Sequence, residues 1–219
     1  MKYPRTYHLP YSPGATNDDK KLQNNYFDYF KGKEIVITEK LDGENTAFTS
    51  QDVYARSHAT PTRSPWSRNL WDTYNGLYWK IKPLLQDNEI IFGENLYGEH
   101  SIKYDKLPSY WFMFAQYDEN SKCWASWDDV KYWAEILETP TVPELWRGKI
   151  ETEKQLETIV TTLASQPSLF GENREGVVVR ITDTFFEEEF SHNVCKWVRP
   201  NHVQTNEHWT RNWKKATLI

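Results

Sequence analysis

The sequence has few of the residues and segments that mark several common protein classes. Its 219 residues include 2 cysteines, Cys123 and Cys195, which are too few for a disulfide framework, and no Cys/His spacing is typical of a zinc site. No apolar run approaches the roughly 20 residues that span a bilayer, and residues 1–14 lack the apolar part of a signal peptide. We therefore expect a protein with no membrane partner, located in the reducing cytoplasm.

A glycine-rich phosphate-binding loop is also missing. The chain has 9 glycines, and none of them forms either of the two common nucleotide-loop patterns, so any nucleotide must be bound in another way. The formal net charge is -5, so a nucleic-acid site would need a local basic patch on an acidic surface. Aromatic residues are plentiful, at 16%, and we expect most of them to pack in the core.

The hydrophobic patterns alternate between groups of strands and helices. Strands are predicted at 34–39, 45–50, 53–57, 88–95, 110–118, 176–181 and 194–198. Helices are predicted to begin after the capping residues Ser64, Ser126 and Thr152, and the first helical pattern continues to Ile81. Residues 1–25 lack periodicity and predict an irregular lead-in. This order of elements predicts an α+β fold with largely antiparallel sheets and flanking helices.

Charged residues stand at four predicted strand ends where packing alone does not require them. The four segments read KLDGEN at 40–45, FGENLYG at 92–98, EGVVVR at 175–180 and CKWVR at 195–199. Each segment alone is typical of a strand that leaves the core and becomes polar. The presence of four such segments in one chain, in this order, indicates a functional role rather than four unrelated strand ends.

Together, in this order, the four segments resemble the signature of the covalent nucleotidyltransferase superfamily of polynucleotide ligases and mRNA capping enzymes. The resemblance runs from about residue 34 to Arg199. Its details favour the RNA ligase 2-like family, because Asn45 and Phe92 stand where DNA ligases usually carry arginine and aspartate. The resemblance implies an ATP-grasp-like nucleotidyltransferase fold. It also implies a monomeric, ATP-dependent ligase that joins 5′-phosphate and 3′-hydroxyl RNA ends.

By this resemblance, Lys40 is the covalent nucleophile. It would attack the α-phosphorus of ATP to give a lysyl-AMP, the AMP would pass to an RNA 5′-phosphate, and a 3′-hydroxyl would then displace it. A protonated lysine is no nucleophile. We therefore expect desolvation, nearby cations or a metal ion to lower the pKa of Lys40.

The resemblance implies three further catalytic residues. Lys196 would hold the α-phosphate and stabilise its developing negative charge. Glu175 would bind Mg²⁺ or Mn²⁺, since hard cations prefer oxygen ligands. Glu94 would hydrogen-bond the ribose or organise the water shell of the metal.

Other residues are implied to bind the nucleotide or the RNA end. Glu39 would read the adenine amino group, and Phe114 would stack on the adenine, although a plain core phenylalanine is an equally good interpretation. Arg56 would meet the ribose or an RNA phosphate. Asn45 and Asp42 would contact the reacting RNA end or shape the lysine loop.

The chain departs from the family pattern at two cations. Relatives usually carry two lysines spaced by one residue in the fourth segment, whereas Lys196 has Val194 and Val198 at the matching offsets. Arg180 stands where a lysine is common, which keeps the charge in the nucleotide site but changes its geometry. The second cation of the fourth segment is therefore an open question.

Two other functions remain as alternatives. One is a DNA ligase or capping guanylyltransferase, against which Asn45 and Phe92 argue. The other is a nucleotide-binding or RNA-binding relative without catalysis, against which the presence of all four catalytic residues argues. Ligases of this superfamily usually carry a further domain, but only 20 residues follow Arg199. We therefore expect one adenylyltransferase domain over 1–219, which is either a minimal ligase, or completed by a partner, or truncated.

The end of the chain is locally basic and aromatic. Trp209 and Trp213 lie four residues apart, so on a helix they would share one face. Either this face packs onto the domain, or the tail grips RNA through Arg211, Lys214 and Lys215.

Overall fold

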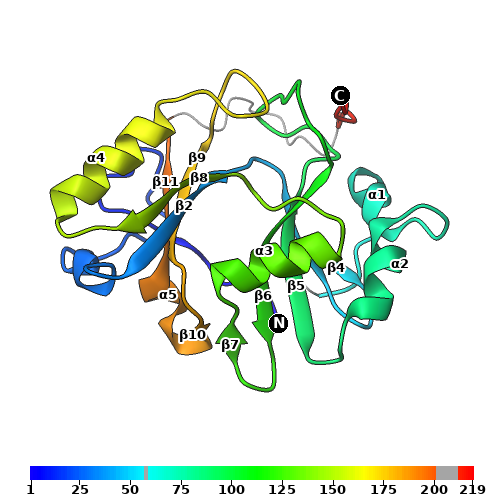
Figure 1. Ribbon diagram of the computed structural model, residues 1–219. Helices are drawn as coiled ribbons and strands as arrows, with labels where there is room; N and C mark the ends of the chain where they lie inside the picture. Colours follow the sequence, from blue (N-terminus) through cyan, green and yellow to red (C-terminus); the bar gives the residue numbers. More distant parts are fainter. Residues whose placement is uncertain (57–58, 201–211) are drawn as a thin grey trace.

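The computed structural model describes residues 1–56, 59–200 and 212–219, whose strands form two sheets (Figure 1). The five-stranded sheet has the order β1 (Tyr7–His8), β11 (Val194–Val198), β9 (Gly176–Ile181), β2 (Glu34–Lys40) and β8 (Glu144–Lys149). The six-stranded sheet has the order β10 (Phe185–Phe186), β7 (Cys123–Trp124), β6 (Trp111–Asp118), β5 (Glu89–Asn95), β3 (Glu44–Phe48) and β4 (Val53–Ala55). Neighbouring strands are antiparallel except β1 and β11, which confirms the predicted α+β class.

Helices flank both sheets. The α-helices are α1 (Arg68–Trp71), α2 (Leu77–Ile81), α3 (Trp127–Ile136), α4 (Glu153–Ala164) and α5 (Phe190–Asn193). Short 3-10 helices cover Tyr26–Tyr29, Pro65–Ser67, Lys82–Leu84 and Glu187–Glu189. In Figure 1, α4 lies on the five-stranded sheet, where it contacts β9 and β11, and α3 packs on β6. Within the described ranges, no helix is long and apolar enough to cross a membrane.

A helical segment begins after each of the three predicted capping residues, as a 3-10 helix in the case of Ser64, and two of the caps are confirmed by side-chain hydrogen bonds. The Ser126 hydroxyl accepts a hydrogen bond from the Asp129 amide (3.1 Å), and the Thr152 hydroxyl accepts one from the Gln155 amide (3.2 Å). The continuous helix predicted after Ser64 is wrong. It ends at Trp71 and resumes at Leu77, because the Asp72 carboxylate accepts hydrogen bonds from the next amides and stabilises a turn instead.

The strand β2 explains how the first sheet presents a lysine to a cavity. Both of its faces are buried, since Ile35 and Ile37 belong to one apolar cluster and Val36 to the other. Burial of each such side chain contributes about 1.5–3 kcal/mol, so the strand is held firmly up to its polar end at Lys40. The strand therefore provides a rigid support for whatever Lys40 does.

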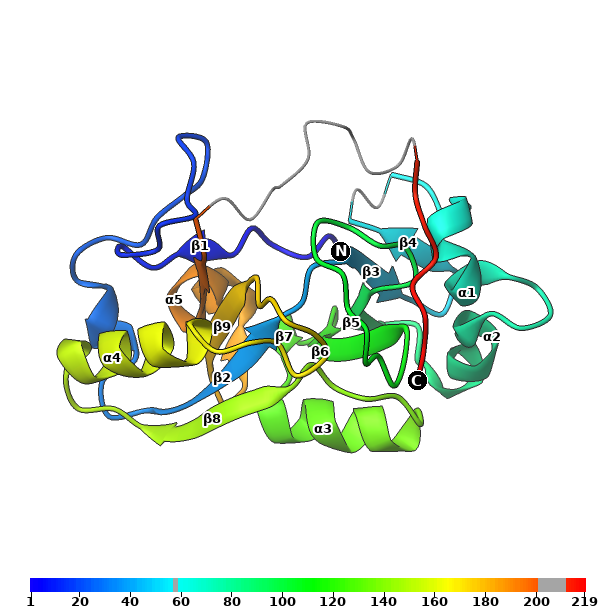
Figure 2. The same ribbon diagram turned by 90° about the horizontal axis from the view of Figure 1, so that it is seen from above.

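Four strands were not predicted from the sequence: β1, β8 and the two-residue strands β7 and β10. Residues of β8 are all half-buried or exposed, so they lack the alternation that marks a strand. The strand β1 lies in the lead-in predicted as irregular, and it pairs in parallel with β11. Figure 2 shows the N-terminal segment running from β11 across to the side of the second sheet.

The described part of the tail packs on the domain. Residues 212–219 form no helix, so Trp213 does not lie on a helical face, whereas Trp209 and Arg211 lie outside the described residues. The Trp213 ring lies 6.0 Å from the Tyr97 ring, and the Glu99 amide donates to the Lys214 carbonyl at 2.8 Å. This arrangement favours the packing interpretation for the last eight residues.

Candidate functional site

A cavity of about 340 Å³ is lined by residues from both sheets. The site residues that the sequence predicted line it, apart from Asp42 and Glu175: Glu39, Lys40, Asn45, Arg56, Glu94, Phe114, Arg180 and Lys196. Glu175 joins the group through a direct bond to Lys40. Four segments that are far apart in the sequence therefore meet in one place.

Lys40 and Glu175 meet because of the strand register. Lys40 ends β2 opposite Gly176 of β9, so the residue before Gly176 comes beside the lysine. The Lys40 ammonium donates a hydrogen bond to the Glu175 Oε2 at 2.6 Å. A side chain at Gly176 would come 2.0 Å from the Trp197 carbonyl oxygen, so only glycine lets β11 approach this closely.

Three hydrogen bonds fix the turn that follows Lys40. The Asp42 amide donates to the Tyr104 hydroxyl (2.8 Å), and the Asp42 carboxylate accepts from the Ile102 amide (2.8 Å). The Gly43 amide donates to the Glu94 carboxylate at 3.0 Å. Asp42 thus shapes the lysine loop, one of the two roles that the resemblance left open for it. Tyr104 was missed because nothing in its sequence surroundings marks it as a partner of this turn.

The electrostatics of Lys40 differ from the expectation. Burial lowers its pKa, but Glu175, Glu94 and Asp42 raise it by more, so the net pKa lies above the ordinary value. Lys40 is therefore protonated at neutral pH, and its ammonium is paired with Glu175. The expected lowering of the lysine pKa is wrong for the protein side chains alone, because Glu175, Glu94 and Asp42 together outweigh the effect of burial.

Burial also acts on the two carboxylates. It raises the pKa of Glu94 to about 8, although Lys40 acts in the opposite direction. The pKa of Glu175 is raised as well, because burial outweighs the attraction of Lys40. Because the two buried carboxyls share one ammonium, Glu94 keeps its proton near neutral pH, and a further cation such as a metal ion would be needed to hold both groups as carboxylates.

This imbalance and the oxygen donors fit Mg²⁺ or Mn²⁺. No group of three or more His, Cys, Asp or Glu side chains within the described ranges forms a complete metal cage. Magnesium usually takes only one or two protein carboxylates and shares the rest of its shell with phosphates and water. Glu175 and Glu94 are therefore suitable ligands for a metal held together with a phosphate group.

Lys196 lies on the β11 wall of the same cavity. Burial lowers its pKa, and the nearby positive charge of Lys40 lowers it further. Val194, two residues earlier, also lines the cavity. The structure thus places a valine on the cavity wall where the family pattern would put a second lysine.

A buried carboxylate stands at another wall of the cavity. Glu39 is 1% exposed, and its Oε2 accepts from the Leu169 amide (3.2 Å) and the Arg174 guanidinium (3.4 Å). Among the described residues its Oε1 has no hydrogen-bond partner. An unpaired buried acceptor fits an incoming amino group such as that of adenine. Arg174 was missed, although its place directly before Glu175 in the third segment is a signal that could have found it.

Phe114 lines the cavity at a β-bulge. The pairing of β5 with β6 shifts between Phe92 and Gly93, and Phe114 is the residue of β6 left without a partner. Bulges redirect a side chain relative to the regular pleat, and here Phe114 lines the pocket. The Tyr3 ring packs edge-on against it at 5.0 Å. Tyr3 was missed because it lies in the segment without periodicity.

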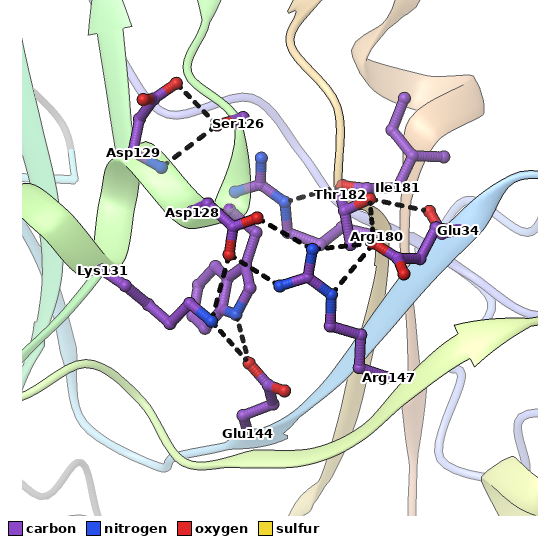
Figure 3. A network of polar contacts seen from close by, with 11 residues as sticks. Glu34, Ser126, Asp128, Asp129, Lys131, Glu144, Arg147, Arg180, Ile181 and Thr182 are labelled. Atoms are coloured by element: carbon purple, nitrogen blue, oxygen red, sulfur yellow. Dashed lines mark hydrogen bonds and ion pairs between the residues drawn. The ribbon is translucent and has the colours of Figure 1, made fainter.

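Arg180 lines the cavity, but most of its guanidinium donors bind backbone carbonyls of the protein. Its guanidinium donates to the carbonyls of Ala125 (2.7 Å), Ile181 (3.2 Å) and Phe114 (3.5 Å). Burial lowers its pKa to about 10. Figure 3 shows Arg180 and its bond to Ile181. These bonds connect β9 to β6 and to the start of α3, which positions the cavity wall.

Asn45 and Arg56 complete the predicted set. Asn45 pairs with Glu94 across β3 and β5, and its Oδ1 is buried with no hydrogen-bond partner among the described residues. This unpaired oxygen is free for a ligand. Arg56, directly after β4, also lines the cavity.

Comparisons with known proteins identify the family. The model of the RNA ligase family matches residues 33–198. The chain belongs to the RNA ligase family. A search of the curated proteins gave no match.

Solved RNA ligases share the fold of this chain. An alanine variant of the Naegleria gruberi RNA ligase with ATP and Mn matches with a TM-score of 0.59 and 19% identity, over 89% of this chain and 60% of that one. The same ligase with pyrophosphate matches with a TM-score of 0.58 and 20% identity, over 91% and 61%. An archaeal ATP-dependent RNA ligase matches with a TM-score of 0.58 and 14% identity, over 90% and 48%. The chain thus spans about 60% or less of the length of these relatives.

Proposed function

We propose that this chain is an ATP-dependent RNA ligase that joins 5′-phosphate and 3′-hydroxyl RNA ends through a lysyl-AMP and an adenylylated RNA. The observation that carries the proposal is the cavity in which Lys40, paired with Glu175, lies with Glu94 and Lys196. The membership of the RNA ligase family supports it. So do the similar folds solved with ATP and Mn, AMP and Mn, or pyrophosphate.

The first step is attack of the Lys40 Nζ on the α-phosphorus of ATP. A nitrogen–phosphorus bond forms, the bond to the bridging oxygen breaks, and pyrophosphate leaves. Because the amine is protonated, its proton must go first, and the Glu175 carboxylate at 2.6 Å is placed to accept it. Lys196 of β11, two strands away from Lys40 in the same sheet, would stabilise the charge that develops on the phosphate.

Other residues would bind and orient the nucleotide. The unpaired Glu39 oxygen would accept the adenine amino group, and Phe114 would stack on the ring. Glu175 and Glu94 would hold Mg²⁺ or Mn²⁺, which when bound supplies charge neutralisation at the phosphates. Arg56 would contact the ribose or an RNA phosphate.

We further infer that RNA is the preferred 3′-hydroxyl strand. Asn45, with its unpaired side-chain oxygen in the cavity wall, supports this preference. Discrimination would come from contacts with the 2′-hydroxyl and from A-form shape near the nick. We place the enzyme in the cytoplasm as a monomer whose catalytic domain lies within 1–219.

The direct test is incubation with ATP and magnesium, followed by a panel of 5′-phosphorylated RNA and DNA substrates. We expect AMP transfer from ATP but not from GTP, and faster sealing of a strand that ends in a ribonucleotide 3′-hydroxyl. Use of GTP would favour a capping guanylyltransferase. Equal sealing of a 3′-terminal deoxynucleotide would favour a DNA ligase, and no AMP transfer at all would favour a binding protein without catalysis.

A further inference from the structure

The β11 wall of the cavity carries one lysine and one valine. Lys196 and Val194 both line the cavity, so this strand offers a single cation to the nucleotide. The proposed substrate ATP carries charge on three phosphates, and Lys196 is assigned to the α-phosphate. The β- and γ-phosphates therefore require positive charge from another element.

We propose that Arg5, in the N-terminal segment, binds the β- and γ-phosphates of ATP and so replaces the cation that β11 lacks. The proposal deepens the proposed ligase function and rests on it. Arg5 lines the same cavity as Lys40 and Lys196, as do its neighbours Pro4 and Thr6. This segment belongs to none of the four motif segments.

The strand register brings Arg5 to the right wall. Tyr7 pairs with Cys195 and His8 with Lys196, in parallel. One residue further back along this register, Thr6 comes level with Val194. Arg5 thus enters the cavity next to the position at which β11 carries a valine.

The segment around Arg5 is fixed from both sides. After it, the Leu9 amide donates to the Lys196 carbonyl at 2.8 Å. Before it, the Tyr3 ring packs against four aromatic rings, those of Phe92, Phe114, Trp124 and Phe190, at 5.0 to 5.4 Å. Figure 2 shows this segment crossing between the two sheets. Arg5 is therefore held at the cavity by its neighbours, and a ligand need not order the backbone first.

The Arg5 guanidinium has donors available for phosphate. One Nη donates to the Asp18 carbonyl at 3.1 Å, which orients the group. A guanidinium carries five N–H donors in a planar fork and binds phosphate oxygens in pairs. The side chain is exposed, so phosphate can reach it.

The test compares ATP with AMP, which lacks the β- and γ-phosphates. We expect Arg5→Ala to raise the KM for ATP in self-adenylylation by about tenfold or more, the scale of a lost hydrogen bond to a charged group. The KM for pyrophosphate in the reverse reaction should rise to a similar extent, and Arg5→Lys should recover part of the loss. Equilibrium binding of AMP, measured on a Lys40→Ala background that prevents turnover, should stay within about twofold.

Lys2→Ala is the matched control, because Lys2 is an exposed cation of the same segment outside the cavity lining. It should leave both nucleotides unaffected. An unchanged KM for ATP in Arg5→Ala overturns the proposal, and so does equal weakening of ATP and AMP, which would indicate a structural role. Absence of lysyl-AMP in the unaltered protein would instead refute the ligase function, while ATP and AMP binding would still decide the role of Arg5.

Discussion

Two charged clusters of this protein use similar side chains in opposite ways. In the first, Lys40 faces Glu175 and Glu94 inside the cavity, and the pKa of both carboxyls is raised, mainly by burial. In the second, Arg147 donates to Glu34 and Asp128 near the surface, and the hydrogen bonds from Arg147 lower the pKa of both carboxyls (Figure 3). Each cluster sets one cation against two carboxyls, so the clusters differ in burial and not in the number of charges: the carboxyls of the surface cluster are exposed, whereas those of the cavity are largely buried. Raised carboxyl pKa values beside a cavity favour a ligand-binding site, whereas the lowered values of the surface cluster are typical of a structural ion pair.

The surface cluster supports the cavity from outside. Arg147 of β8 reaches Glu34 of β2 (2.7 Å) and Asp128 of α3 (2.6 Å). Beside it, the Trp127 indole, which lines the cavity, donates to Glu144 of β8 at 2.7 Å. The cluster therefore fixes α3 to the first sheet.

The largest difference between the clusters should appear in catalysis. We expect Glu175→Ala to slow self-adenylylation by ~100-fold or more, because Lys40 loses both its proton acceptor and its electrostatic partner. Glu34→Ala removes a carboxylate of the surface cluster and serves as control, with a rate within a few-fold of the parent. A Glu175→Ala rate as close to the parent as that of the control would contradict the assignment.

The second difference concerns pH and stability. Because the folded pKa of Glu94 is raised to about 8, the folded state binds this proton more tightly than the unfolded state. Its contribution to stability is full below about pH 4.5 and is lost as pH rises towards 8. We therefore measure the free energy of unfolding by denaturant, without metal, for the parent and for Glu94→Gln. The variant should become more stable relative to the parent by about 1–3 kcal/mol as the pH rises from 5 to 8. A stability difference between variant and parent that does not change with pH would show that the pKa of Glu94 is not raised in the folded protein.

The smallest effect on stability is expected for a carboxyl of the surface cluster, and its pH dependence should be opposite to that of Glu94. The pKa of Asp128 is lowered by Arg147, so its contribution is present above the ordinary carboxyl pKa and is lost on acidification. Asp128→Asn should cost about 1 kcal/mol or less at pH 7, since Asp128 is 60% exposed. The stability difference should begin to shrink below the ordinary carboxyl pKa of 3.8 and vanish only as the pH falls through the lowered folded pKa, with adenylylation unchanged at neutral pH. A large loss of adenylylation would mean that this cluster belongs to the active site.

Site residues could be predicted from the sequence where they lie at strand ends in recognisable segments. Lys40, Glu94, Glu175 and Lys196 were found in this way, and the structure brings them together. Contacts between side chains could not be predicted where they depend on the pairing of strands that are far apart in the sequence. The direct bond from Lys40 to Glu175 follows from the register of β2 with β9, which no local pattern encodes.

The missed residues share the same physical cause. Tyr3 and Arg5 carry no periodicity, and their place in the cavity depends on the pairing of β1 with β11. The bulge at Phe114 depends on the pairing of β5 with β6. The pKa of Lys40 was expected in the wrong direction, because it is set by the sum of three carboxylates that meet only in the folded chain.

The central claim is that Lys40 is the covalent nucleophile, and mapping the attached nucleotide tests it most directly. After incubation with ATP and magnesium, peptide mass spectrometry should find one AMP per chain, joined to the Lys40 side-chain nitrogen. Lys40→Ala should carry none. AMP on another residue, or full labelling of Lys40→Ala, would contradict the account.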